Sequence, residues 1–165
     1  MSKMAWLVAL VRGFAYVAAL LCGVLLAATV PARAAEGPSF SLTDQNSAPI
    51  TEARLRGKPT VLVVGFTRCP VICPTTLYEV AQQMKRLEKK ADAINFVFMT
   101  LDPERDTADV LKAYLESFDE RMIGITGSAS EVKKLADAFG ATATKVPLPD
   151  GDYTVDHSVV SYIMD

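Results

Sequence analysis

The stretch TVLVVGFTRCPVICPTTLYEV, residues 60–80, decides the fold class of this chain of 165 residues. Its first seven residues, 60–66, form an unbroken apolar and β-branched run, which is typical of a strand buried on both faces of a sheet. Pro74 suits the first turn of a helix, where its missing N–H group has no partner to lose. Apolar residues then recur at helical spacing as far as Leu87. A buried strand that leads straight into an amphipathic helix is typical of α/β folds.

Outward from this stretch, strands and helices continue to alternate. Further strands are predicted at 94–100, 122–126 and 158–164, and further helices over 110–118 and 129–139. Ser128 and Glu131 form a capping box for the second of these helices, which Gly140 ends. Residues 39–50 predict a β-hairpin around an Asp-Gln-Asn-Ser turn, and a loop rich in Thr and Pro is expected up to about Tyr153. This order predicts an α/β fold whose central strands run parallel.

The first 34 residues predict an export signal or a membrane anchor. An apolar segment without a charge, 14–30, is followed by Ala32 and Ala34, which give the small-x-small pattern that signal peptidases recognise. The same segment is just long enough for a helix across a bilayer core of roughly 30 Å, so an uncleaved anchor is the alternative. Both alternatives place one domain, residues 35–165, on the far side of a membrane.

The charge balance argues against nucleic-acid binding. All 19 acidic residues lie beyond residue 34, against 14 of the 17 basic ones, so the domain carries a net charge of about −5. A nucleic-acid-binding surface requires Lys and Arg gathered on one face or along one helix. We therefore expect no nucleic-acid partner.

Two of the three cysteines, Cys69 and Cys73, directly follow the buried strand, while Cys22 belongs to the apolar leader. In an oxidising compartment a structural disulfide is the first alternative. A bridge across three residues would constrain the unfolded chain very little, because the stabilisation grows with loop length. Redox or metal chemistry therefore explains the pair better. The helix N-terminus at this point is expected to favour thiolate over thiol, which suits both nucleophiles and metal ligands.

His157 is the only histidine in the chain and stands just before the strand predicted at 158–164. It is either a metal ligand or an ordinary surface or core residue, and the residues alone leave both interpretations open. Asp156 beside it is expected to orient the imidazole, as carboxylates next to metal ligands do. Together with Cys69 and Cys73, the histidine would give three ligands, whereas structural zinc normally takes four. Two soft thiolates at a low coordination number favour Cu(I).

Five segments of the chain resemble the SCO/SenC family of copper chaperones. In chain order they are LTDQNSAPIT, LRGKPTVLVVGF, GFTRCPVICPTTLYEV, TLDPERDTADVLKAYLESF and YTVDHSVVSYIMD, and the resemblance runs from about residue 38 to the end. It implies a thioredoxin-like α/β fold with a mixed central sheet flanked by helices. It also implies that Cys69, Cys73 and His157 are copper ligands for Cu(I) or Cu(II), and that the two cysteines can form a redox disulfide.

The role implied by this resemblance is that of a metallochaperone rather than a turnover enzyme. The protein would deliver copper to the binuclear copper site of cytochrome c oxidase, or keep the thiols of that site reduced. Its expected partners are the copper-site subunit of the oxidase and other periplasmic copper carriers. The expected location is the periplasm or the outer face of the bacterial inner membrane, with the segment 14–30 as the membrane anchor if it is not cleaved.

The chain departs from the family pattern in two places. Val71 stands where family members commonly have Asp after the first Cys-Pro, which removes a carboxylate near the metal and leaves the three ligands intact. Family members also continue for roughly another strand and helix beyond the last predicted strand, whereas this sequence ends at Asp165. We therefore expect a domain that lacks the final strand and helix, with an unpaired sheet edge, exposed apolar surface and reduced stability.

Two other functions compete with the copper chaperone. A thiol–disulfide oxidoreductase outside the cytoplasm would need both cysteines and would depend little on His157. A peroxidase is less favoured, because neither cysteine follows the P-x-x-x-T-x-x-C pattern. Arg105 and Asp106, in the DPERD segment, are expected to organise a loop and to cap the next helix.

Overall fold

The computed structural model describes residues 37–164, and the predicted leader, with Cys22 and the segment 14–30, lies outside them. The strands are β1 (Ser41–Asp44), β2 (Pro49–Thr51), β3 (Thr60–Gly65), β4 (Asn95–Thr100), β5 (Ile123–Thr126), β6 (Ala143–Pro147), β7 (Tyr153–His157) and β8 (Ser161–Met164). The helices are α2 (Ile72–Leu87), α3 (Ala108–Glu116) and α4 (Ala129–Ala138), with the 3₁₀ helices η1 (Glu52–Arg54) and η2 (Glu88–Ala93). No helix in the described range is long and apolar enough to span a membrane.

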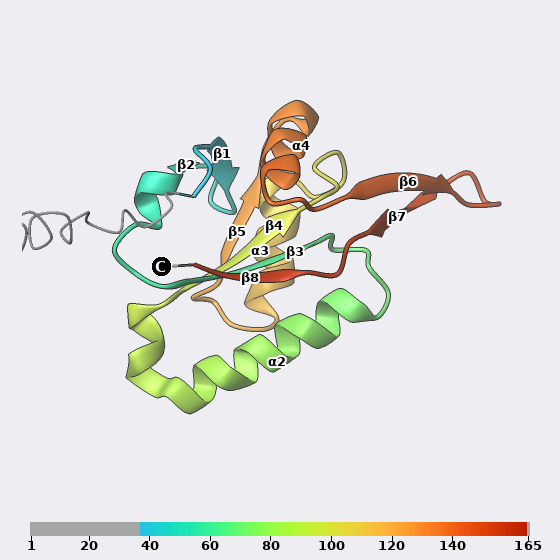
Figure 1. Cartoon of the computed structure of the whole chain (residues 1–165). Helices are drawn as coiled ribbons and strands as arrows, with labels where there is room; N and C mark the ends of the chain where they lie inside the picture. Colours follow the sequence, from blue (N-terminus) through green and yellow to red (C-terminus); the bar gives the residue numbers. More distant parts are fainter. Residues whose placement is uncertain (1–36, 165) are drawn as a thin grey trace, which may run out of the picture. The chain divides into compact units, whose positions relative to one another are not determined.

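Six strands form a mixed central sheet in the order β2-β1-β5-β4-β3-β8 (Figure 1). The central strands β3, β4 and β5 run parallel, whereas β1 and β8 pair antiparallel with their neighbours. The prediction of an α/β fold with parallel central strands and a mixed sheet is therefore confirmed. The β1–β2 hairpin also forms as predicted, with Leu42 opposite Ile50.

Helices cover both faces of this sheet: α4 lies on one, and α2 and α3 lie on the other (Figure 1). Successive side chains of a strand point to opposite faces. Leu62 and Val64 of β3 accordingly pack with the residues of α4, while Val63 packs with Leu77 of α2. This burial on both sides explains why β3 is an unbroken apolar run, as expected for a central parallel strand.

The helix ends follow local hydrogen-bonding rules, with one correction. Ser128 and Glu131 form the predicted capping box at the start of α4. The cap of α3 is Thr107, whose side-chain oxygen accepts a hydrogen bond from the Val110 N–H group. Asp106, predicted as this cap, is instead fully buried. Its carboxylate accepts hydrogen bonds from Thr67 and Thr100, and the next residue, Thr107, occupies the capping position.

The segment predicted as a loop up to Tyr153 contains half of a β-hairpin. Strands β6 and β7 pair antiparallel from Ala143 opposite His157 to Pro147 opposite Tyr153, and they form a sheet of their own that projects from the domain (Figure 1). All five residues of β6 are exposed, so no apolar period marks this strand. His157, which was predicted to stand just before the final strand, is the last residue of β7.

Strand β8 pairs with β3 at the edge of the sheet and begins at Ser161, three residues later than predicted. Within residues 37–164, no strand pairs with its outer side. Tyr162 and Met164 pack on the α4 face, whereas Ile163 points the other way and is 81% exposed. The predicted unpaired edge and exposed apolar side chain are thus both present in the described part of the chain.

Candidate metal centre

The structure brings together the three predicted ligands, which come from two distant parts of the sequence. The sulfur atoms of Cys69 and Cys73 and a ring nitrogen of His157 all lie within 4.8 Å of one another. The distance from Cys73 Sγ to His157 Nε2 is 3.8 Å. A metal ion with bonds of roughly 2.0–2.3 Å to nitrogen and sulfur can join three such atoms with little movement. Only these three residues form such a group in the described range.

The loop between β3 and α2 positions both cysteines. Cys69 closes a turn in which its N–H group donates to the Phe66 carbonyl oxygen. Val71 precedes α2 and makes no side-chain cap, so the N–H groups of the first helical turn are open to other acceptors. The Cys69 sulfur accepts a hydrogen bond from one of them, the Cys73 N–H group. Both cysteines are buried free thiols.

The two thiols differ in acidity. Burial raises the pKa of Cys69, but hydrogen bonds from the Cys73 N–H group and from His157 outweigh it and lower this pKa to about 7. Burial, with a smaller contribution from the neighbouring Cys69, raises the pKa of Cys73 to about 12. The N–H groups at the start of α2 therefore favour the thiolate at Cys69, whereas deeper burial favours the thiol at Cys73.

His157 lies at the end of β7, on the same face as Val155 and Tyr153, which pack with the two cysteines. Its ring meets Phe66 edge-on, with 5.5 Å between the ring centres. Its Nδ1 atom lies 2.9 Å from the Ser158 carbonyl oxygen. A proton on Nδ1 would be donated to this oxygen. Nε2 faces the cysteines: a proton on Nε2 is donated to the Cys69 sulfur, and its loss leaves the lone pair that a metal ligand needs.

Asp156 does not orient the ring as predicted. Because side chains alternate along a strand, Asp156 points away from the face that carries His157, and it is exposed to solvent. The Ser158 carbonyl oxygen takes the predicted role of the carboxylate.

Gly65, at the end of β3, leaves the space that the Cys73 sulfur fills. A Cβ atom at this position would lie 2.5 Å from Cys73 Sγ and 3.2 Å from a ring carbon of Phe98. We expect Gly65→Ala to lower the free energy of unfolding by about 1–3 kcal/mol, because one of these groups must move. Gly37→Ala is the matched control, since no atom lies within 4 Å of its added Cβ. Urea unfolding checks this, and equal effects of the two variants would contradict it.

A polar cluster fixes the turn end of the β6–β7 hairpin, at Asp152 and Tyr153, to the DPERD loop. The Arg105 side chain donates to Asp102 at 2.5 Å, to the Tyr153 carbonyl oxygen at 2.7 Å and to Asp152 at 2.9 Å. Its guanidinium group lies 3.6 Å from the centre of the Tyr153 ring, and the Tyr153 hydroxyl donates to Asp102 at 2.7 Å. Arg68, beside Cys69, also pairs with Asp152. The cluster therefore holds the strand that carries His157 close to the cysteine loop.

The prediction that Arg105 organises a loop is confirmed by its hydrogen bonds to Asp102 and Tyr153. Its partners Asp102, Asp152 and Tyr153, which lie up to 48 residues from Arg105 in the chain, were not predicted. The only available signal was the density of charged residues in DPERD and in PDGDY (149–153). Such density is equally common in solvated turns.

We expect Arg105→Met to free the turn end of the hairpin. Removing one partner of a buried ion pair typically costs about 3–5 kcal/mol, because it leaves the other charge buried, and here Asp102 is only 1% exposed. Lys133→Met is the control, since its pair with Asp137 is exposed and worth about 0.5 kcal/mol. Urea unfolding gives the size of the loss. Hydrogen exchange locates it, and unchanged amide protection in 143–157 would contradict the anchoring role.

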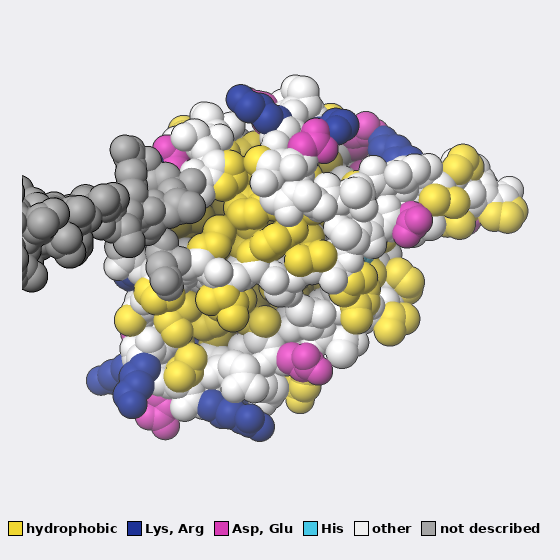
Figure 2. All heavy atoms as spheres, viewed as in Figure 1, with side chains coloured by type: hydrophobic (Ala, Val, Ile, Leu, Met, Phe, Trp, Pro, Cys, Tyr) yellow, Lys and Arg dark blue, Asp and Glu magenta, His cyan; other side chains and the backbone are white. Residues whose placement is uncertain are grey.

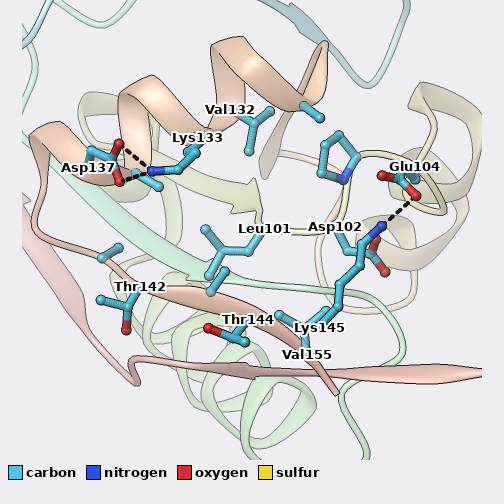
Figure 3. Close-up of a pocket in the computed structure, with 15 residues that line it drawn as sticks. Leu101, Asp102, Glu104, Val132, Lys133, Asp137, Thr142, Thr144, Lys145 and Val155 are labelled. Carbon is cyan, nitrogen blue, oxygen red and sulfur yellow. Dashed lines mark hydrogen bonds and ion pairs between the residues drawn. The ribbon is translucent and has the colours of Figure 1, made fainter. Parts of the chain in front are cut away.

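A separate hollow of about 440 Å³ lies between α4, the DPERD loop and β6 (Figure 3). Its apolar lining includes Leu101, Val132 and Val155. The two lysines that line it are already paired: Lys145 with Glu104, and Lys133 with Asp137 (Figure 3). Its lining contains no cysteine or histidine, so it offers no ligand to a soft metal ion.

The family of the chain follows from a comparison with known proteins. The family model described as SCO1/SenC matches residues 28–165. The chain belongs to the SCO1/SenC family. It is 39% identical over 133 residues to the mitochondrial protein SCO1 homolog 1 of Arabidopsis thaliana, and 40% identical over 132 residues to mitochondrial SCO2 of Saccharomyces cerevisiae. These matches cover 80% and 78% of this chain, but only 40% and 44% of the two relatives.

Solved structures of SCO1/SenC proteins share the fold. The structure of Bradyrhizobium japonicum ScoI with copper bound has a TM-score of 0.76 and 44% sequence identity, and the match covers 79% of this chain and 83% of that one. The expected thioredoxin-like architecture is therefore confirmed for this SCO1/SenC protein.

Proposed function

We propose that this SCO1/SenC protein binds one Cu(I) ion through Cys69, Cys73 and His157 and passes it to a partner protein. The observation that carries this proposal is the approach of two free thiols and one imidazole nitrogen to within 4.8 Å. It is supported by the fold and sequence shared with a ScoI protein whose structure contains copper.

The ligand set favours Cu(I) over other ions. A structural zinc site normally has four protein ligands, and only three gather here among the described residues. Thiolates are soft ligands that suit Cu(I), whereas oxygen ligands, which harder ions prefer, are absent from the group. Imidazole accommodates both copper oxidation states, so Cu(II) is the secondary cargo.

Transfer would proceed by exchange of ligands without a change in oxidation state. An incoming thiolate bonds to Cu(I) as one ligand of this protein leaves, and the proton released by the incoming thiol passes to the departing ligand. His157 is the first ligand to leave in this scheme, because it is neutral and belongs to the hairpin, whereas the thiolates share the β3–α2 loop.

The recipient we propose is the copper-site subunit of cytochrome c oxidase, and the location is the periplasm or the outer face of the bacterial inner membrane. The support is membership of the SCO1/SenC family and the export pattern of residues 1–34, which lie outside the described residues. Cell fractionation with an epitope at the C-terminus tests the location, and a cytosolic pool of full-length protein would contradict it.

A titration tests the copper proposal directly. The reduced protein should remove one equivalent of Cu(I) from a chromophoric chelator, while prior alkylation of both thiols should abolish this uptake. Uptake of a full equivalent by the alkylated protein would place the copper elsewhere.

A second candidate function is thiol–disulfide exchange, favoured by two adjacent free thiols of which Cys69 is the more acidic. The Cys69 thiolate would attack a partner disulfide and form a mixed disulfide. Cys73 would then attack Cys69 Sγ and release the partner as a dithiol, so that the partner gains two electrons and this protein gains a disulfide.

The two functions make different predictions for His157. Exchange needs only the cysteines, so His157→Ala should retain disulfide reduction, whereas copper binding should fall sharply. A dithiol potential in the range of known exchange proteins, roughly −120 to −270 mV, together with negligible Cu(I) uptake, would favour exchange.

A further inference from the structure

The opening of the metal centre is bordered by exposed aliphatic side chains. Cys69 and Cys73 are only 8% and 3% exposed. Beside them, Val71 is 67% exposed and Val159 is 63% exposed, and Ile72 and Val160 are exposed by more than a third. We call Val71, Ile72, Val159 and Val160 the apolar collar. Figure 2 shows hydrophobic side chains gathered where α2 begins and where β7 leads to β8.

Most of the apolar collar adjoins the candidate ligands Cys73 and His157. Ile72, Val159 and Val160 line a small depression together with Cys73 and His157. One half of the collar, Val71 and Ile72, lies where the β3–α2 loop enters α2, between the two cysteines in the sequence. The other half, Val159 and Val160, lies in the link between β7 and β8 that follows His157. Single exposed aliphatic residues are ordinary on a protein surface, but a contiguous group around a site marks a contact surface.

The collar contains no charged residue. Of the charged residues near it in the sequence, Arg68 forms an ion pair and Asp156 points away from the metal centre. Arg68 forms an ion pair with Asp152 at 3.2 Å. Asp156 points away from the face of β7 that carries His157. Val71 stands at a position directly between the two cysteines, so the residue nearest to both sulfurs in the sequence is aliphatic as well.

We propose that the apolar collar is the docking surface for the copper acceptor, and that the acceptor presents an uncharged aliphatic surface around its own copper ligands. This inference rests on the proposed copper transfer. An acceptor ligand must come within bonding distance of an ion held by buried sulfurs, so the acceptor surface must cover the residues that border the opening. That requirement favours the acceptor as occupant over a second copy of this chain.

An apolar docking surface has a kinetic signature. Long-range charge attraction accelerates association and fades as salt screens it, whereas contact between aliphatic surfaces is insensitive to moderate salt. Copper transfer to the acceptor should therefore change less than about threefold between about 50 mM and 500 mM NaCl.

Stopped-flow transfer of Cu(I) tests the collar. The acceptors are the copper-free, reduced copper-binding domain of the oxidase subunit and, separately, the small chelator bicinchoninate. Val159→Asp and Val159→Lys should each slow transfer to the protein at least about tenfold, because they place a charge in a contact that excludes water. Transfer to the chelator should change less than about twofold, since a small molecule needs no docking surface.

Val146→Asp is the matched control, because Val146 is 40% exposed on β6 and lies outside the collar. It should leave both transfer rates unchanged. If the collar variants transfer copper to the protein as fast as Val146→Asp, or if transfer falls steeply with salt, the collar proposal is wrong. If the parent protein takes up no Cu(I), the proposed function itself fails, so the two failures are distinguishable.

Discussion

Replacing Asp106 with alanine is expected to lower the free energy of unfolding by about 3–5 kcal/mol. The Asp106 carboxylate is fully buried and accepts three hydrogen bonds. They come from the Thr67 N–H group at 2.9 Å, the Thr67 hydroxyl at 2.6 Å and the Thr100 hydroxyl at 2.6 Å. Hydrogen bonds to a charged group contribute about 1.5–3 kcal/mol each, and their loss leaves buried donors without a partner.

The same substitution should disturb the metal centre, because Thr67 lies two residues before Cys69. Chemical unfolding of copper-free protein measures the first effect, and Cu(I) affinity measures the second. Asp109→Ala is the control: this exposed carboxylate in the first turn of α3 contributes at most about 1 kcal/mol through the helix dipole. A loss of stability no greater than that of Asp109→Ala would show that Asp106 does not hold the loop.

Cys73→Ala is expected to weaken Cu(I) binding at least about 10³-fold. Even residues that only support a metal ligand typically cost 10–100-fold when changed, so the loss of one of three direct ligands should cost more. The sulfur of Cys73 lies 3.8 Å from His157 Nε2, and Gly65 leaves room for it.

Competition against a chelator of known affinity measures this loss. Thermal unfolding of copper-free Cys73→Ala separates it from misfolding, since the substitution removes one buried sulfur. Cys73→Ser keeps a group of similar size with a hard oxygen, and it should bind Cu(I) as weakly as the alanine variant. Near-parental affinity of the serine variant would show that sulfur at this position is not a ligand.

The sheet and its covering helices could be predicted because each carries a strong local signal. β3 and β4 are unbroken apolar runs, and α4 has a capping box. The β6–β7 hairpin could not be predicted in the same way. Every side chain of β6 is exposed, so the strand is defined by its backbone pairing with β7 and not by any apolar period. Pairing between strands depends on the turn and the partner, which a single segment does not reveal.

The three candidate ligands that the structure brings together could be selected from the sequence, but the arrangement that holds them could not. The two cysteines stood out by their position after a buried strand, and the resemblance to SCO/SenC proteins added His157. The orientation of the ring depends on the Ser158 carbonyl oxygen, and any residue supplies such a group. The cluster of Arg105 with Asp102 and Tyr153 joins segments about 50 residues apart, so only the folded chain shows it.

Different contacts hold the two cysteines and the histidine in place. The cysteines lie in the β3–α2 loop, which Asp106 ties down through Thr67. His157 lies at the end of the β6–β7 hairpin, which Arg105 ties to the domain at its other end through Tyr153. A site built in this way can keep its sulfurs in place while the imidazole moves, which is what stepwise ligand exchange requires.

The most direct test of the three-ligand site is a Cu(I) competition titration of the reduced parent protein beside His157→Ala. The account predicts one equivalent of Cu(I) for the parent, and an affinity at least about tenfold lower for His157→Ala, because the remaining two thiolates must hold the ion without the imidazole. Equal affinity of the two proteins would contradict it, since copper would then be held without the only histidine of the chain.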